Sequence, residues 1–226
     1  MRRLVLILLM ILFSTTSCRL MNSPSPSTSG NTSDIVTSST ANRYRTDELR
    51  DYNGTHLDPA VGPRDNSIKG IQNVSLTGYT LSIDGQVNIT RSLSYDEITA
   101  MPSVTRLLTL YCVEGWDATL LLKGVLMKDL LDPSEVKPEA KTVIFHASDG
   151  YTTSLPLGEI LDKNLMMAYQ ANGLPLPPAM GFPFIFVAEN KWGYKWARWI
   201  NRIELSTETN YRGYWESLGY DNAGDR

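Results

Sequence analysis

The chain opens with an apolar run and then changes to polar sequence. Arg2 and Arg3 precede ten consecutive apolar residues, Leu4 to Phe13. This run is too short to cross a bilayer as a helix and is typical of an export signal over residues 1–20. Cys18 follows small residues, as in lipoprotein signals, which favours lipid attachment there. The alternatives are a plain signal peptide cleaved nearby and an uncleaved N-terminal anchor.

The polar sequence that follows predicts two further segments before the globular part. Residues 21–46 are dominated by Ser, Thr, Asn and Pro. Such a stretch buries too little apolar surface to offset its ordering entropy, so it predicts a disordered tether. Residues 47–70 are polar and punctuated by Gly and Pro, which predicts an arm. Regular patterns of apolar and polar positions are confined to residues 71–226, a length that suits one domain.

The pattern within this domain predicts many short strands and a few short helices. Residues 79–90 alternate apolar and polar positions around Asp84-Gly85, which predicts a β-hairpin. Ser94 and Glu97 form a capping box, which predicts a helix over 94–101. The remaining predicted elements are strands over 105–111, 141–147, 151–155, 165–170, 184–188 and 199–205, and helices over 125–131 and from Pro156. Without a regular βαβ alternation, the prediction is an α+β fold with a mixed, partly barrel-like sheet.

Composition narrows the possible partners. The net charge is −3 and the pI is about 5.4, so the chain has no strong basic field, which argues against nucleic acid. The chain has two cysteines, Cys18 in the signal and Cys112 in the domain. Cys112 therefore lacks a disulfide partner, and such a thiol is reactive, ligating or buried.

Cys112 lies between a β-rich run and the turn-like sequence 114–116. A thiol there is a small core residue, a nucleophile or a ligand to a transition metal. The only histidines are His56 and His146 and no CxxC occurs, so a zinc site built from protein ligands alone is not predicted. A thiol enzyme using Cys112 and His146 is one hypothesis. A metal whose other ligands come from a cofactor is another.

Several sequence blocks occur in a fixed order: YCVEGW, ASDGYTTSLPL, MMAYQANGLPLPP, GFPF and WGYKWARWINRIEL. Together they resemble the molybdopterin-binding domain of the sulfite oxidase family, which includes the periplasmic methionine-sulfoxide reductase catalytic subunit. The resemblance covers roughly residues 76–220. It implies a sulfite-oxidase-type fold and an oxidoreductase that carries a molybdenum–molybdopterin cofactor.

The resemblance also implies roles for individual residues. Cys112 would ligate molybdenum, and Tyr151 would line the substrate pocket. Lys195, Trp196 and Arg198 would contact the cofactor, whose phosphate needs charge-assisted hydrogen bonds. Taken from the residues alone, Tyr151 is equally a half-buried strand aromatic. The alternative for Lys195 and Arg198 is the solvated face of a strand, and the tryptophans and tyrosines interleaved with them favour the cofactor role.

Two positions depart from the family pattern. Met180 replaces a polar residue and Ile185 replaces an arginine, both of which contact the cofactor in the family. The loss of one charge-assisted bond to a phosphate costs about 1.5 to 3 kcal/mol. No counterpart of the upstream substrate arginine is found, so sulfite is not the expected substrate.

The predicted function is oxygen-atom transfer to or from a small substrate outside the cytoplasmic membrane. The chain would be held on the membrane by its N-terminal lipid or anchor. It contains no CxxCH and no iron–sulfur cysteine set, so a separate electron-transfer partner, such as a membrane protein, is expected. The alternative is a cofactor-free relative that serves as an exported binding or surface module.

Overall fold

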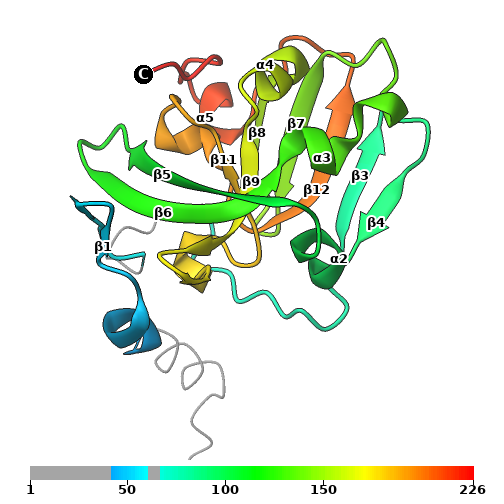
Figure 1. The fold of residues 1–226 in the computed structure, drawn as a ribbon. Coiled ribbons are helices and arrows are strands. Elements are labelled where there is room, and N and C mark those ends of the chain that lie inside the picture. The colour runs from blue at the N-terminus through cyan, green and yellow to red at the C-terminus, as the bar shows by residue number, and fades with distance from the viewer. Residues whose placement is uncertain (1–41, 61–66) are drawn as a thin grey trace, which may run out of the picture.

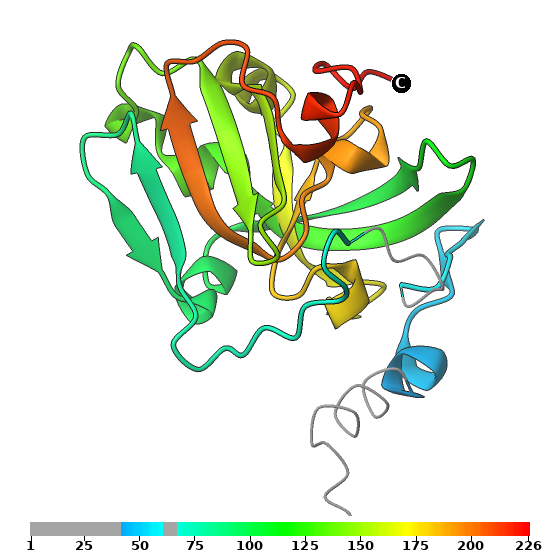
Figure 2. The same cartoon turned by 180° about the vertical axis from the view of Figure 1, so that it is seen from behind.

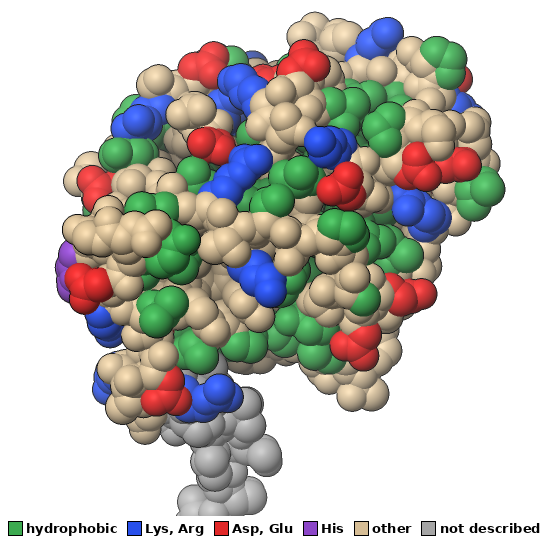
Figure 3. All heavy atoms as spheres, in the orientation of Figure 1, with side chains coloured by type: hydrophobic (Ala, Val, Ile, Leu, Met, Phe, Trp, Pro, Cys, Tyr) green, Lys and Arg blue, Asp and Glu red, His purple; other side chains and the backbone are tan. Residues whose placement is uncertain are grey.

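The computed structural model describes residues 42–60 and 67–226. The predicted export signal, its Cys18 and most of the predicted tether lie outside the described residues. In the part that is described, no helix is long and apolar enough to cross a membrane. On the face seen in Figure 3, side chains of both charge signs are interspersed with apolar ones.

The first sheet is mixed and holds five strands. In spatial order these are β4 (Arg91–Leu93), β3 (Leu81–Gly85), β12 (Ile200–Ser206), β7 (Thr142–Ala147) and β8 (Thr152–Pro156). The central strand β12 is parallel to β3 and antiparallel to β7. Its Ile203 is paired with Ile83 on one side and Phe145 on the other, and all three are fully buried.

The second sheet is antiparallel and curves around the first (Figure 1). Its strands are β10 (Leu174–Pro175), β9 (Met166–Ala171), β6 (Asp117–Leu126) and β5 (Ser103–Tyr111), and β11 (Ile185–Val187) also pairs with β9. Phe145 of β7 stacks on Phe186 of β11 with ring centroids 3.8 Å apart. This contact joins the two sheets through one hydrophobic core.

The helices are short and lie at the edges of the sheets. They are α2 (Tyr95–Thr99), α3 (Met127–Leu131), α4 (Leu157–Asp162), α5 (Tyr214–Ser217) and the 3-10 turns η1 (Pro133–Glu135), η2 (Pro178–Met180) and η3 (Gly193–Lys195). The predicted capping box of α2 is present, because Ser94 and Glu97 each bond the backbone N–H of the other.

The structure differs from the predicted elements in three places. Strand β6 was not predicted, because residues 120–122 are all buried and show no alternation. Its last residues, Val125 and Leu126, had been predicted as helix. The predicted hairpin is present, because β3 pairs antiparallel with β4, but its connection is longer than predicted and runs from Gly85, the last residue of β3, to Arg91. Gln86 N in this connection donates to Leu205 O (2.7 Å). Pro156 is the N-cap of α4 and not its first residue.

The arm packs against the second sheet and begins earlier than predicted. Residues 42–47 are helical, although the tether was predicted to run to residue 46, and Tyr44 is only 3% exposed. An aromatic ring in an otherwise polar stretch gains enough from burial to order these residues. Strands β1 (Asp51–Tyr52) and β2 (Thr55–His56) follow as a small hairpin. Figure 2 shows this arm beside β6.

A buried polar network fixes the arm. The Glu48 carboxylate accepts hydrogen bonds from Ala60 N (3.0 Å) and from Asn172 Nδ2 (3.1 Å). Asn172, which is fully buried, also accepts from Leu121 N (3.0 Å) and donates to Asp58 O (2.9 Å). One side chain therefore links the arm to strand β6.

We expect Asn172→Ala to lower the free energy of unfolding by roughly 2 to 4 kcal/mol. The change leaves several buried groups unpaired, and alanine is strained at the left-handed backbone of this position (φ 50°). Urea unfolding of the variant beside Asn88→Ala, which alters an exposed amide, provides the measurement. A loss of less than about 0.5 kcal/mol would contradict the structural role of the network.

Candidate functional site

Cys112 begins the loop that joins β5 to β6. Its N–H donates to Trp116 O (2.8 Å), and Gly115 N donates to Cys112 O (3.1 Å), so backbone bonds close the loop. Gly115 has φ 86°, a left-handed conformation in which glycine is favoured. Cys112 is 5% exposed. The hairpin thus presents the thiol from a well-defined position at a strand end.

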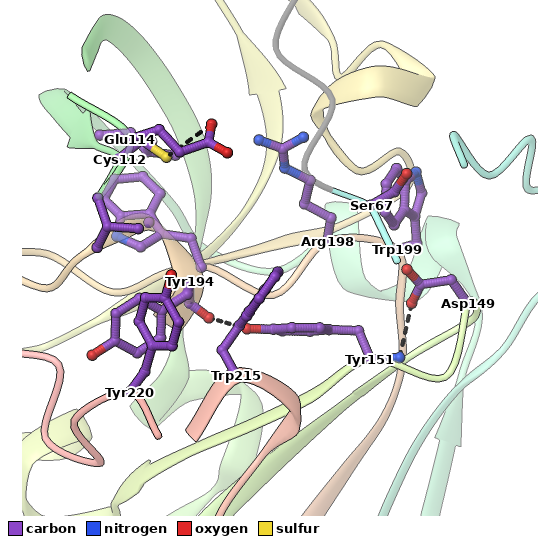
Figure 4. Close-up of a pocket in the computed structure, with 14 residues that line it drawn as sticks. Ser67, Cys112, Glu114, Asp149, Tyr151, Tyr194, Arg198, Trp199, Trp215 and Tyr220 are labelled. Atoms are coloured by element: carbon purple, nitrogen blue, oxygen red, sulfur yellow. Dashed lines mark hydrogen bonds between the residues drawn. The ribbon is translucent and has the colours of Figure 1, made fainter. Parts of the chain in front are cut away.

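The thiol lies in a cleft of about 250 Å³ that five distant parts of the chain build. These parts are Ser67, the Cys112 loop, the turn before β8, the segment 193–199 and the C-terminal residues Trp215 and Tyr220 (Figure 4). Gly193 packs directly behind the Cys112 loop, since a Cβ there would lie 3.2 Å from Tyr111 O. The cleft is therefore formed by long-range packing and not by one sequence motif.

Glu114 places a carboxylate beside the thiol. Cys112 Sγ lies 3.8 Å from Glu114 Oε2, and Trp116 Nε1 donates to the same oxygen at 3.1 Å. Figure 4 shows the carboxylate projecting from the loop into the cleft. A proton-exchanging group is thus available next to Cys112.

Tyr151 lines the cleft as predicted, but its hydroxyl is engaged within the chain. The hydroxyl donates to Tyr194 O, and Tyr151 N donates to Asp149 Oδ1 (2.9 Å). Burial raises the pKa of the Tyr151 phenol well above its usual value, so the hydroxyl stays neutral and acts as a donor. Tyr151 thereby holds the Tyr194 backbone in place at the cleft.

Arg198 and Trp196 also line the cleft. Arg198 NH1 donates to Ala179 O (2.8 Å), and the same side chain borders a smaller adjoining pocket. Gly181 has φ 104°, and a Cβ there would lie 2.7 Å from Arg198 Cβ, so a larger residue would displace the arginine. Cys112, Tyr151, Trp196 and Arg198 are thus brought together.

Lys195 is placed elsewhere, and its predicted contact to a cofactor phosphate is not available to its side chain. The residue is fully buried, and Nζ donates to Glu216 Oε1 (2.6 Å) and Ser154 O (2.9 Å). Burial lowers the pKa of Lys195, while the Glu216 carboxylate opposes that shift. Glu216, which the sequence did not single out, holds the ammonium away from the cleft.

The two positions that depart from the family pattern lie apart from one another. Ile185 is fully buried in β11 opposite Ala168 and does not line the cleft. Met180 is half-buried and borders the adjoining pocket with Arg198. Of these two, only Met180 is thus close to the predicted site.

The structure does not bring His146 to Cys112. His146 Nε2 lies 3.0 Å from Glu204 Oε2 and 3.1 Å from Arg202 NH1, on the first sheet. Burial lowers the pKa of His146, and the residue is not among those that line the cleft. The hypothesis of a Cys112/His146 thiol enzyme is therefore wrong.

Comparison with known families identifies the domain that carries this cleft. Residues 68–215 match the oxidoreductase molybdopterin binding domain. The chain belongs to this family. The match confirms the resemblance drawn from the sequence blocks, and the members of the family are enzymes.

Individual relatives agree with this assignment. The chain is 36% identical over 151 residues to the uncharacterized oxidoreductase YuiH of Bacillus subtilis, covering 66% of this chain and 76% of YuiH. It is 30% identical over 151 residues to a putative protein-methionine-sulfoxide reductase subunit, YedZ1, of Azospira oryzae, covering 67% of this chain and 57% of that protein. This chain thus spans little more than half the length of YedZ1, and the activity of that longer protein is not assigned to this chain.

A solved structure confirms the fold. The sulfane dehydrogenase SoxCD of Paracoccus pantotrophus matches with a TM-score of 0.58 and 23% identity, over 62% of this chain and 41% of that one. This likeness concerns the architecture alone, and it confirms the predicted α+β sulfite-oxidase-type fold.

The residues of the cleft fit a molybdenum–molybdopterin cofactor. Within residues 42–60 and 67–226, no three His, Cys, Asp or Glu side chains gather as a metal site. Cys112 therefore offers a single soft ligand, which suits a metal that brings its other ligands in a dithiolene. Arg198 supplies a guanidinium in the same cleft, a suitable donor to phosphate or oxo groups.

Proposed function

We propose that this protein transfers an oxygen atom to or from a small substrate by means of a molybdenum held by Cys112. The observation that carries the proposal is the thiol at a fixed strand end, inside a cleft that Arg198 and Tyr151 also line. When bound, the cofactor supplies the two-electron chemistry of oxygen transfer. The protein residues orient the reactants, exclude water and move protons.

The side chains of the cleft have distinct roles in this proposal. The Cys112 thiolate holds the metal, and the Arg198 guanidinium stabilises negative charge on the cofactor. The Glu114 carboxylate, 3.8 Å from the sulfur, exchanges the protons that accompany oxygen transfer. Tyr151 and Trp196 shape the cleft through packing and the bond to Tyr194 O.

Activity with artificial electron carriers tests this function. Purified protein is assayed with reduced viologen and a panel of organic S-oxides and N-oxides, and in the reverse direction with ferricyanide and oxygen acceptors. Oxidation of viologen that depends on an oxygen donor, or reduction of ferricyanide that depends on an acceptor, supports the proposal. Molybdenum-loaded protein that is inactive in both directions would refute it.

We expect Arg198→Gln to weaken cofactor retention by about 10- to 100-fold. One charge-assisted hydrogen bond is worth about 1.5 to 3 kcal/mol, and glutamine lacks the charge. Molybdenum per chain is measured after extended dialysis. Arg106→Gln is the matched control, because Arg106 pairs with Glu189 (3.0 Å) and does not line the cleft. Equal retention in the two variants would show that Arg198 does not contact the cofactor.

We also propose that the protein is exported and attached to the membrane through a lipid on Cys18. The apolar run before Cys18 and the polar segment after it support this part. Labelling of whole cells with a radioactive fatty acid is expected to mark the protein, and Cys18→Ser is expected to remove the label. Equal labelling of both forms would exclude lipid attachment at Cys18.

A separate protein is proposed to exchange electrons with the cofactor. The sequence carries no haem-attachment motif, and the YedZ1 relative is named as a subunit. Purification from membranes under mild detergent, followed by mass spectrometry of associated redox proteins, would identify that protein.

A further inference from the structure

The C-terminal segment contributes an aromatic surface to the cleft. Trp215 and Tyr220 line the cleft, and here they are called the aromatic wall. Figure 4 shows Tyr220 below the Cys112 loop and Trp215 between Tyr220 and Arg198. The family match ends at residue 215, so Tyr220 lies outside it. Trp215 is the last residue of the match.

The aromatic wall is held rigidly from behind. Trp215 and Tyr220 pack edge to face with centroids 5.4 Å apart, and Tyr220 packs likewise on Tyr194 at 5.3 Å. Arg212 donates to Tyr220 O (3.1 Å) and to Glu216 O (2.8 Å). The buried Lys195–Glu216 pair lies beneath, so the rings are fixed in advance of any ligand.

Packing within the protein does not cover the whole aromatic wall. Among the residues that line the cleft, Tyr220 is 37% exposed and Val113 is 43% exposed. Two large side chains of the cleft are thus accessible to a ligand. Exposed apolar groups in a cleft are typical of a binding surface.

The charges that remain for a substrate favour a cation, because the proposed function assigns Arg198 to the anionic cofactor. Of the two acidic residues that line the cleft, Asp149 is buried and accepts a hydrogen bond from Tyr151 N, which leaves the Glu114 carboxylate. The carboxylate of Glu114 is the charge that lies beside Cys112 (3.8 Å). An aromatic face attracts a cation within about 6 Å of the ring centroid. The carboxylate beside Cys112 and the faces of the aromatic rings therefore both favour a cationic ligand.

We propose that Trp215 and Tyr220 determine the choice of substrate and that the substrate is a small organic cation with apolar groups, not an inorganic oxyanion. The apolar cationic group packs on the aromatic wall and directs the reacting atom of the substrate toward Cys112. This inference rests on the proposed function, since it names the substrate class of that site. Trp215 and Tyr220 are specificity-determining residues in this proposal and take no part in the oxygen transfer itself.

Binding of two unreactive probes tests the proposal. Tetramethylammonium and sulfate are titrated separately into the molybdenum-loaded protein, and binding is followed by ligand-observed NMR. Tetramethylammonium is expected to bind, and sulfate is expected neither to bind the cleft nor to displace it. Trp215→Leu and Tyr220→Leu are each expected to weaken tetramethylammonium binding by about 5- to 30-fold, the range of a cation–π contact. Tyr52→Leu is the control, because Tyr52 is equally exposed (37%) but lies in the arm.

The outcomes separate this proposal from the proposed function. Absence of tetramethylammonium binding, tighter binding of sulfate, or affinities of both wall variants within twofold of the unaltered protein would overturn the proposal. Because Tyr220 is exposed, its variant is informative even if Trp215→Leu fails to fold. Molybdenum per chain is recorded for each sample, so failure of the cofactor assignment is visible independently of probe binding.

Discussion

Replacing Cys112 by serine is expected to abolish turnover while the protein remains folded. A hydroxyl is a poor ligand for a metal that prefers soft thiolate, so we expect activity to fall at least about 100-fold, since even indirect partners of a metal ligand contribute 10- to 100-fold. The loop itself is closed by backbone bonds between Cys112 and residues 115 and 116, which serine preserves. Turnover with viologen and the thermal unfolding midpoint are measured together.

Ile89→Ser is the control for this prediction. Ile89 is 61% exposed and does not line the cleft, so the change replaces an apolar residue with serine away from the thiol. Activity close to that of the unaltered protein is expected. Full turnover in Cys112→Ser would remove the thiol from the mechanism.

The Lys195–Glu216 pair is expected to give the largest effect on stability. Both side chains are 0% exposed, and their charged atoms are 2.6 Å apart. Glu216→Leu leaves an unpaired ammonium in the core, which we expect to cost about 3 to 5 kcal/mol in the free energy of unfolding. Thr153, which donates to Glu216 Oε1 (2.5 Å), also loses its partner.

A double variant distinguishes the effect of the unpaired buried charge on stability from the effect of lost packing. In Lys195→Met with Glu216→Leu, no charge remains buried, and such replacements are often neutral, so most of the stability is expected to return. Urea unfolding of both variants provides the measurement. A loss below about 1 kcal/mol in Glu216→Leu, or no recovery in the double variant, would contradict this account of the pair.

The strands and helices with a clear period were predictable from the sequence. The capping box of α2 and the alternation of β12 depend on neighbouring residues alone. Strand β6 was not predictable in this way. Its residues 120–122 are buried on both faces, and this burial arises from strands and arm residues far away in the chain.

The residues of the candidate site were predictable only where one of the family-like sequence blocks contains them. Cys112, Tyr151, Trp196 and Arg198 do line one cleft, while their roles toward a cofactor stay predictions. Lys195 does not, because its neighbour in space is Glu216 of α5, and a pairing between distant elements leaves no local pattern. Tyr220 was missed for the same reason, since its place in the cleft depends on bonds from Arg212 and packing on Tyr194.

We propose that Cys112 binds the molybdenum of a molybdopterin cofactor, and elemental analysis of the full chain, purified from a host that makes molybdopterin, tests this binding. We expect stoichiometric molybdenum in the unaltered protein and its loss in Cys112→Ser. Folded protein without molybdenum, beside a loaded control enzyme from the same host, would exclude the proposed cofactor and favour a cofactor-free module in which Cys112 serves only in packing.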